Sequence, residues 1–244
     1  MNGLWAVYRR ELTSYVSTPT AYVFVAVFLF AIGAFTFQVG QFFEQGRADL
    51  GGFFLFHPWL FMVFLPAVAM RLWAEETRAG TAEILLTLPT PTWALVVGKF
   101  LAAWTVAAVA LALTVPLWIS VNLLGLPDNA AIFVGYLASL LMAGAYIAIG
   151  SAMSALTASQ VVAFILAVLV SFVFTVSGTP LLLNFFQGAL GPAAVETVAS
   201  VSILAHFDAA QRGVIELRSL VFFGSLIGLF LVWTALAVDA RRGG

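Results

Sequence analysis

The longest stretch of the sequence without a charged residue runs from Asn129 to Val195 and reads NAAIFVGYLASLLMAGAYIAIGSAMSALTASQVVAFILAVLVSFVFTVSGTPLLLNFFQGALGPAAV. A helix needs about 20 predominantly apolar residues to cross the hydrocarbon core of a bilayer. The stretch is long enough for two such helices, and the polar run from Ser154 to Gln160 divides it. The two transmembrane helices predicted here cover residues 131–153 and 161–183, with a cytoplasmic turn between them.

The composition of the whole chain indicates the same class of protein. Of its 244 residues, 63% are hydrophobic and only 9% are charged. A soluble domain carries about 25% charged residues and roughly 45–50% apolar residues. Because so few charges could not cover the surface of a soluble protein of this length, the sequence predicts an all-α integral membrane protein that crosses the bilayer several times.

Four more apolar segments complete the prediction of six transmembrane helices within one domain over residues 1–244; they cover 20–42, 53–73, 93–124 and 219–238. Short cytoplasmic loops are enriched in Lys and Arg. With the N-terminus inside, seven of the ten basic residues lie on the inner side and three on the outer side. The inner set is Arg9, Arg10, Arg71, Arg78, Lys99, Arg241 and Arg242, and the outer set is Arg47, Arg212 and Arg218. This distribution predicts that both termini are cytoplasmic.

An amphipathic helix is predicted over residues 2–18, before the first span. Apolar and aromatic side chains recur there at helical spacing around a short charged run, which is typical of a helix lying in the membrane interface. The alternative is a frayed N-terminal tail. The residues assigned to the interfacial role are Trp5, Tyr8, Arg9, Arg10 and Glu11.

Residues 74–90 hold the densest charge in the chain and read AEETRAGTAEILLTLPT. Gly80 and Thr81 can begin a short helix, with Glu83 favoured in its first turn by the helix dipole and Pro89 limiting its length. The apolar residues from Ile84 to Leu88 would then lie beside charges at the cytoplasmic face. Such residues are either buried against the protein's own helices or contact a partner. The alternative is an ordinary solvated connector.

The segment 184–218 lies on the outer side. Its first half is apolar but is interrupted by Gly188, Gly191 and Pro192, so we predict re-entrant or interfacial packing rather than another crossing. Its second half is expected to form a polar outer lip, which either is a folded turn or contacts an auxiliary protein. The candidate residues of this lip are His206, Asp208, Arg212, Glu216 and Arg218.

Several kinds of chemistry have no motif in this sequence. There is no phosphate-binding G-x-x-x-x-G-K-[ST] loop and no catalytic H-E-x-x-H or G-x-S-x-G motif. Cysteine is absent, and two histidines do not suggest a metal site. The net charge of −1 gives no reason to expect nucleic-acid binding. We therefore expect no catalytic residues, no cofactor and no metal in this chain.

The predicted spans carry no ionisable residue near their centres. Ion-coupled carriers usually place such a residue near the midplane of the bilayer, where it titrates or binds the ion. The sequence therefore disfavours a secondary carrier, and the scattered polar residues disfavour an intramembrane enzyme. Energy for any transport is expected to come from another chain.

Three motifs resemble the ABC-2 type exporter permeases. The run EETRAGTAEILLTLP followed by TPTWALVVGKF is similar to their cytoplasmic loop, and YRRELTSYVSTP is similar to their interfacial helix. The run HFDAAQRGVIELRSLVFF before the last span resembles the gliding-motility (Gld-type) subgroup. The resemblance covers nearly the whole chain. It implies a type V exporter-like fold whose cytoplasmic loop contains a coupling helix, with the matching residues Glu75, Glu76, Arg78, Gly80, Thr81, Glu83, Leu85, Leu86, Pro89 and Lys99.

The resemblance also implies a function and an assembly. Two permease copies would pair with two ATP-binding subunits, which would hold ATP and Mg²⁺, in the bacterial inner membrane among its lipids. A membrane-anchored auxiliary subunit facing the periplasm would join them in the Gld-type subgroup. The expected function is export of a substrate that the sequence does not identify. The alternative is mechanical or assembly work on a partner, as in gliding or surface-structure machinery.

Overall fold

The computed structural model describes residues 2–44, 46, 48–81, 90–179, 182–184 and 197–241. The regular structure in these ranges is helical, and they contain no strand. In chain order the elements are α1 (Asn2–Ser17), α2 (Pro19–Ala34), the π-helix η1 (Phe35–Val39), α3 (Gly51–Leu55), α4 (His57–Ala69), α5 (Arg71–Ala79), α7 (Thr92–Ala112), α8 (Val115–Leu124), α9 (Asn129–Leu156), α10 (Gln160–Val176), α13 (Ile203–Gln211) and α14 (Leu217–Ala240).

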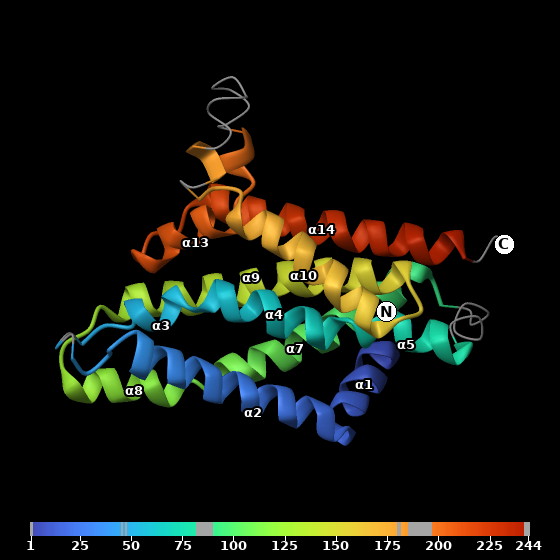
Figure 1. Ribbon diagram of the computed structural model, residues 1–244. Helices are drawn as coiled ribbons and strands as arrows, with labels where there is room; N and C mark the ends of the chain where they lie inside the picture. Colours follow the sequence, from blue (N-terminus) through green and yellow to red (C-terminus); the bar gives the residue numbers. More distant parts are fainter. Residues whose placement is uncertain are drawn as a thin grey trace.

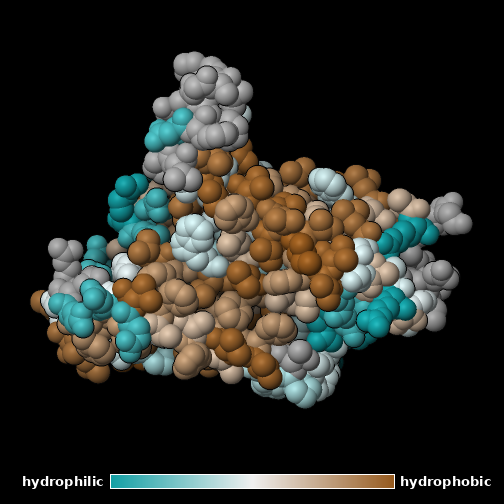
Figure 2. Space-filling model, in the orientation of Figure 1, coloured by the Kyte–Doolittle hydropathy of each residue, from teal (hydrophilic) through white to brown (hydrophobic). Residues whose placement is uncertain are grey.

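Five helical segments of the described chain are long and apolar enough to cross a membrane. They are Ala21–Val39, His57–Ala79, Thr92–Leu124, Asn129–Leu156 and Leu217–Ala240. Figure 2 shows apolar residues over the middle of the visible face and polar residues toward its two ends, as expected for a bundle that spans a bilayer. The prediction of an all-α, multi-pass membrane protein is confirmed. The apolar helix α10 has 17 residues and falls short of this length, so the count of six spans stays a prediction.

Helix α9 runs through the middle of the bundle, where it packs against α4, α7, α10, α13 and α14 (Figure 1). Its second half is buried on all sides and is rich in Ala, Gly and Ser. Small residues let helix backbones approach closely, and this close packing holds helices together inside a membrane. Gly150 lies very close to α4, since an added Cβ there would lie 2.5 Å from the Cβ of Ala69.

We expect Gly150→Ala to lower the free energy of unfolding by about 1–3 kcal/mol, because the α4 backbone would have to move away from α9. Gly33→Ala in α2 is the matched control, since no atom lies within 4 Å of an added Cβ there. Denaturant titration in detergent micelles measures both. Alanine favours helices by roughly 0.5–1 kcal/mol over glycine, so the control should be neutral or slightly stabilising. Equal stabilities of the two variants would contradict this account of the α4–α9 contact.

Several boundaries differ from those expected from the sequence. The segment predicted as one span over 93–124 is divided at Leu113 and Thr114 into α7 and α8. The reason is Pro116, which has no N–H to continue the α7 hydrogen-bond pattern and lies in the first turn of α8. The span predicted over 20–42 ends in the π-helix η1, and the one predicted over 161–183 is helical as α10 only to Val176.

The second span also differs, because residues 74–79 belong to α5 rather than to a loop. The span predicted over 53–73 comprises α3, α4 and α5, with Pro66 inside α4 and a break at Met70. Gly80 ends α5 in the left-handed conformation (φ +70°), and its N–H is directed to the carbonyls of Glu76 and Thr77. This is the usual glycine cap of a helix C-terminus. The predicted 74–90 loop therefore begins as a helical extension of the span.

The two ends of the described chain lie at the same end of the bundle (Figure 1). Thr92 at the start of α7 donates a hydrogen bond to Asp239 near the end of α14, and Arg241 donates to Thr77 of α5. Helix α1 packs along α7 near the same end, whereas α3, α8 and α13 lie toward the opposite end. We call the end that holds the two ends of the described chain the α1–α5 end of the bundle.

Candidate functional site

Helix α1 is fixed against the bundle by close packing and by two tyrosines. At Gly98 of α7 an added Cβ would lie 2.9 Å from a methyl group of Val7, so α1 and α7 approach closely at this point. Tyr8 and Thr105 share a hydrogen bond between their hydroxyls, of 3.1 Å. Tyr15 is buried and donates its hydroxyl to the carbonyl of Val68, 3.2 Å away. Burial raises the pKa of Tyr15 well above its usual value, so the phenol stays a neutral donor.

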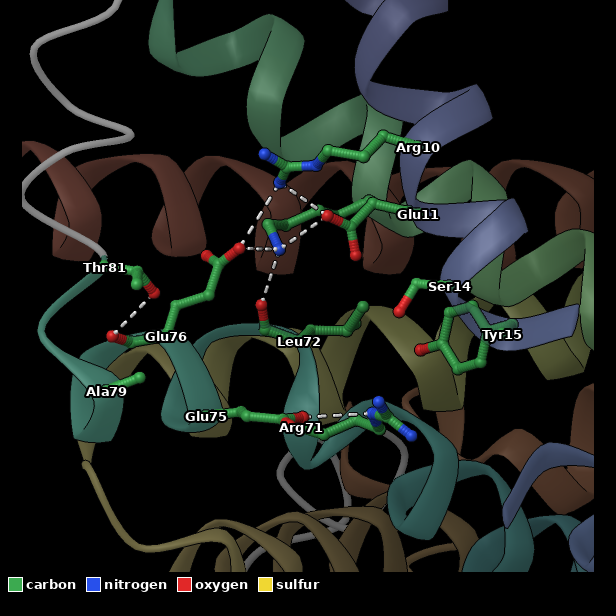
Figure 3. A pocket seen from close by; sticks show the side chains of 11 residues that line it. Arg10, Glu11, Ser14, Tyr15, Arg71, Leu72, Glu75, Glu76, Ala79 and Thr81 are labelled. Carbon is green, nitrogen blue, oxygen red and sulfur yellow. Dashed lines mark hydrogen bonds and ion pairs between the residues drawn. The ribbon is translucent and has the colours of Figure 1, made fainter. Parts of the chain in front are cut away.

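A buried lysine connects α1, α5 and α7 at the α1–α5 end. The side chain of Lys99 in α7 is only 2% exposed. Its Nζ lies 2.8 Å from Oε1 of Glu76 in α5 and 3.2 Å from Oε1 of Glu11 in α1. It also donates to the carbonyl of Leu72, at 2.9 Å. Arg10 Nη2 reaches the same two carboxylate oxygens, at 2.7 Å for Glu11 and 3.4 Å for Glu76 (Figure 3).

These four residues, Arg10, Glu11, Glu76 and Lys99, form what we call the Lys99 cluster, which has two positive and two negative charges. Burying an isolated ammonium group is very costly, so a buried lysine needs charged or polar partners close by. Burial by itself raises the pKa of the Glu11 carboxyl, but Lys99 and Arg10 outweigh it and hold this pKa below its usual value. Glu11 therefore stays a carboxylate and compensates the Lys99 charge. The ring of Trp73 adds a cation–π contact, with Nζ 5.2 Å from its centroid.

Two serines of α9 fix the start of α5. Ser154 Oγ accepts hydrogen bonds from the backbone N–H groups of Trp73 and Ala74, at 3.1 and 3.0 Å, and donates to the carbonyl of Met70 at 2.6 Å. Ser151 Oγ accepts from the indole N–H of Trp73 at 3.1 Å. The first N–H groups of a helix have no partner within the helix. Ser154 satisfies one of them, that of Trp73, and also accepts from the N–H of Ala74, and so it positions α5 after the break at Met70.

A cleft of about 360 Å³ separates α1 from α5 beside the Lys99 cluster. Figure 3 shows Glu11, Ser14 and Tyr15 on one side and Leu72, Glu75 and Glu76 on the other. Arg71 pairs with Glu75 at 3.2 Å, and its guanidinium lies 5.6 Å from the ring centroid of Tyr15. Thr81, which is the last described residue before position 90, also lines the cleft. The cleft therefore adjoins the segment predicted to couple to an ATPase.

The residues predicted for coupling are divided between two parts of the chain. Glu76 lies in the Lys99 cluster, Glu75 pairs with Arg71, and Arg78 is exposed in the last turn of α5. Gly80 caps α5, and Thr81 donates to the carbonyl of Glu76. The predictions for Glu83, Leu85, Leu86 and Pro89 lie outside the described residues.

The residues predicted for the interfacial helix point in different directions from α1. Glu11 faces the Lys99 cluster, and Tyr8 is half-buried against α7. Trp5, Arg9 and Arg10 are exposed. One side of α1 is therefore packed against the protein, and the other carries a tryptophan and two arginines.

At the opposite end, the structure places His206 beneath the predicted polar lip rather than on it. Its ring is stacked on Phe222, 4.2 Å between centroids. Nε2 donates to the carbonyl of Ser200 and Nδ1 accepts from the hydroxyl of Ser219, both at 3.0 Å. His206 is buried because it joins α13 to α14 and to the turn before α13, and both ring nitrogens are satisfied there.

The other predicted lip residues are exposed: Asp208, Arg212, Glu216 and Arg218. Partial burial raises the pKa of the Asp208 carboxyl, and the nearby Arg212 only partly offsets this. Within the described ranges, no group of three His, Asp or Glu residues could hold a metal ion. These four side chains thus form a charged surface at this end.

Sequence reasoning placed Arg10 and Glu11 in one predicted element and Glu76 in another, and it did not foresee that Lys99 joins them. It also missed Trp73, Ser151 and Ser154 as the residues that hold α5. The only sequence signal for the cluster is a lysine at the eighth position of an otherwise apolar helix, α7. Such a lysine has to meet an acidic partner or leave the membrane.

Comparison with known proteins gives one family. The model of the family described as "ABC-2 family transporter protein" matches residues 5–240, which includes every residue of the Lys99 cluster. No curated protein matches the chain.

Proposed function

The chain belongs to the ABC-2 transporter family and is thus a membrane subunit of an ABC transporter, and from this we propose that it is the permease, moving its substrate across the bacterial inner membrane with ATP hydrolysed by a separate subunit. ATP and Mg²⁺ would be bound by that partner. We propose export as the direction, and both termini in the cytoplasm. The shared position of α1 and the end of α14 supports two ends on one side of the membrane, and the excess of basic residues assigned to that side favours the cytoplasm.

The Lys99 cluster is the observation that carries this proposal. Helix α5 continues the second span and contains the first residues, 74–79, of the predicted coupling segment 74–90. Through Glu76 it is bonded to Lys99 of α7 and to Arg10 of α1, and through Trp73 and Ala74 it is bonded to α9. A force applied to residues 74–90 would therefore reach several helices at once. Charged hydrogen bonds in a buried setting keep their partners in register, so α5, α1 and the start of α7 would move as one body.

In the proposed mechanism, the ATP-binding subunits close on ATP and press on residues 74–90. The α1–α5 end then tilts as a unit, which shifts the second and third spans. A path for the substrate opens between two permease copies. Gly224 and Gly228 on α14 support a pairing of copies, because space is open around both positions and small residues favour close helix contacts.

A second candidate function is mechanical or assembly work on a periplasmic partner of the Gld type. The exposed charges Asp208, Arg212, Glu216 and Arg218 at the end opposite the Lys99 cluster favour a protein contact there. ATP hydrolysis that the partner stimulates, without movement of a solute, would distinguish this function from export.

The first test is to purify the tagged chain from its host in mild detergent and measure the bound ATP-binding subunit. Leu85→Asp should reduce the retained subunit more than tenfold, since a buried apolar anchor in an interface is worth about 2 kcal/mol or more. Leu126→Asp is the matched control, because Leu126 is fully exposed in the turn between α8 and α9, at the opposite end.

Retention by the control but not by Leu85→Asp supports the permease assignment and places the contact in the segment 74–90. The assignment would be overturned by a wild-type chain that purifies as a stable oligomer with no nucleotide-binding partner. Equal retention by both variants would move the contact elsewhere on the α1–α5 end.

A further inference from the structure

We propose that the exposed side of α1 and the start of α7 form a binding site for one anionic phospholipid. The two helices border an open groove of about 1040 Å³. Its walls include Leu4, Trp5, Arg9, Arg10, Thr13 and Trp93. In this assignment the arginines bind the phosphate of the head group, and the apolar and aromatic residues contact the first part of the acyl chains. The groove borders the Lys99 cluster at Arg10, and its other lining residues do not belong to that cluster.

The charge of the groove is the first argument. Two arginines line it, and no acidic residue is among its lining residues in the described chain. Arg10 is engaged with Glu11 and Glu76, but Arg9 forms no ion pair with another described residue. An arginine guanidinium binds a phosphate through paired, charge-assisted hydrogen bonds. Arg9 is thus available for a phosphate at this position.

The two tryptophans are the second argument. Trp5 is 61% exposed and Trp93 is 57% exposed. Tryptophan is enriched at the level of the lipid head groups, where its ring meets apolar chains and its N–H meets polar groups. Trp5 is stacked on Tyr8 with 5.1 Å between centroids, which holds the ring in place at the groove. Beyond Trp93, α7 continues as an apolar helix into the bundle.

The shape of the groove favours a lipid over a small soluble anion. A free phosphate would be bound best in a narrow pocket with several donors, whereas this groove is wide, open at the side and partly apolar. The groove lies where the arginines of α1 meet the start of the apolar helix α7, which is the arrangement expected for a phosphate head group at the membrane interface. A phospholipid uses both the arginines and the apolar wall, so it is the occupant that fits this groove.

The test uses the full chain in zwitterionic detergent, titrated with phosphatidylglycerol that carries brominated acyl chains. Bromine quenches tryptophan fluorescence at short range. We expect saturable quenching by this lipid and only weak, unsaturable quenching by brominated phosphatidylcholine. Arg9→Gln should raise the midpoint of the titration about fivefold, the contribution of one arginine beside an anionic lipid surface. Trp93→Phe should remove part of the saturable amplitude.

Arg218→Gln is the matched control, because it removes the same charge from an exposed position at the opposite end. It should leave the midpoint unchanged. Thermal unfolding of Arg9→Gln should match that of the wild type, since Arg9 is exposed. Equal quenching by the two lipids, or equal midpoints for Arg9→Gln and Arg218→Gln, would overturn the proposal. Displacement of the brominated lipid by millimolar glycerol phosphate would also overturn it, because the site would then bind a soluble anion.

Discussion

Replacing Lys99 with methionine is expected to lower the free energy of unfolding by about 3–5 kcal/mol, which is the usual cost of removing one partner from a buried charge pair. Methionine fills a similar volume but leaves the carboxylates of Glu11 and Glu76 with Arg10 as their one cationic partner in the cluster. Because both carboxylates are mostly buried, water cannot fully replace the lost ammonium group. Denaturant titration in detergent micelles, followed by circular dichroism, gives the change.

The matched control for Lys99→Met is Arg10→Gln. Arg10 belongs to the same cluster, but half of its side chain is exposed, so its loss should cost about 1 kcal/mol or less. Adding Glu76→Gln to Lys99→Met removes one of the two carboxylates that have lost Lys99 and should recover about 1 kcal/mol. A Lys99→Met variant as stable as Arg10→Gln would contradict the buried cluster. The buried cluster would also be contradicted if the stability loss of the double variant equalled the sum of the losses of Lys99→Met and Glu76→Gln.

Local opening provides a second readout of the same variant. In the wild type, α1 is bonded to the bundle through Glu11 and Arg10 as well as by packing. We expect hydrogen exchange in residues 2–17 to become faster in Lys99→Met than in Arg10→Gln, because α1 loses its buried anchor. Unchanged exchange in α1 would show that packing at Gly98 and the hydrogen bonds of Tyr8 and Tyr15 are enough to hold this helix.

The second large effect is expected for Ser154→Val. This change removes the acceptor of the buried Trp73 and Ala74 N–H groups and the donor to the partly buried Met70 carbonyl. A buried donor left without a partner costs about 1–3 kcal/mol, so the total loss of stability should be roughly 2–4 kcal/mol. The same titration measures this loss, and hydrogen exchange should show faster opening of residues 71–79.

Ser225→Val in α14 is the control for this substitution. Ser225 is exposed, and its hydroxyl donates only to the carbonyl of Phe222 in its own helix. Its replacement should change stability by no more than about 0.5 kcal/mol. If the two serine variants have equal stability, Ser154 is not what positions α5 after the break at Met70. Under the proposed function, Ser154→Val should also lower the amount of substrate transported per ATP hydrolysed. The reason is that α5 would transmit the push of the ATP-binding subunits to the other helices.

The class of the protein could be predicted from the sequence because it depends on local properties. Length, apolar content and the spacing of charged residues are enough to indicate membrane-crossing helices, and the position of α1 at the N-terminus follows from its periodic pattern. The helical residues 74–79 show the limit of this reasoning. They are polar enough to suggest a loop, yet they continue the span as α5 because Ser154, a distant residue, satisfies the N–H groups near the start of that helix.

The site itself was decided by the tertiary structure. Glu11, Glu76 and Lys99 lie far apart in the sequence, and no local pattern indicates that their side chains are in contact. They meet because Gly98 lets α1 approach α7 and because α9 holds α5 beside both. His206 shows the same dependence, since its polar neighbours in sequence suggested a surface position and packing against α14 buried it. Apolar length is a property of each segment, whereas the pairing of buried charges depends on which helices pack together.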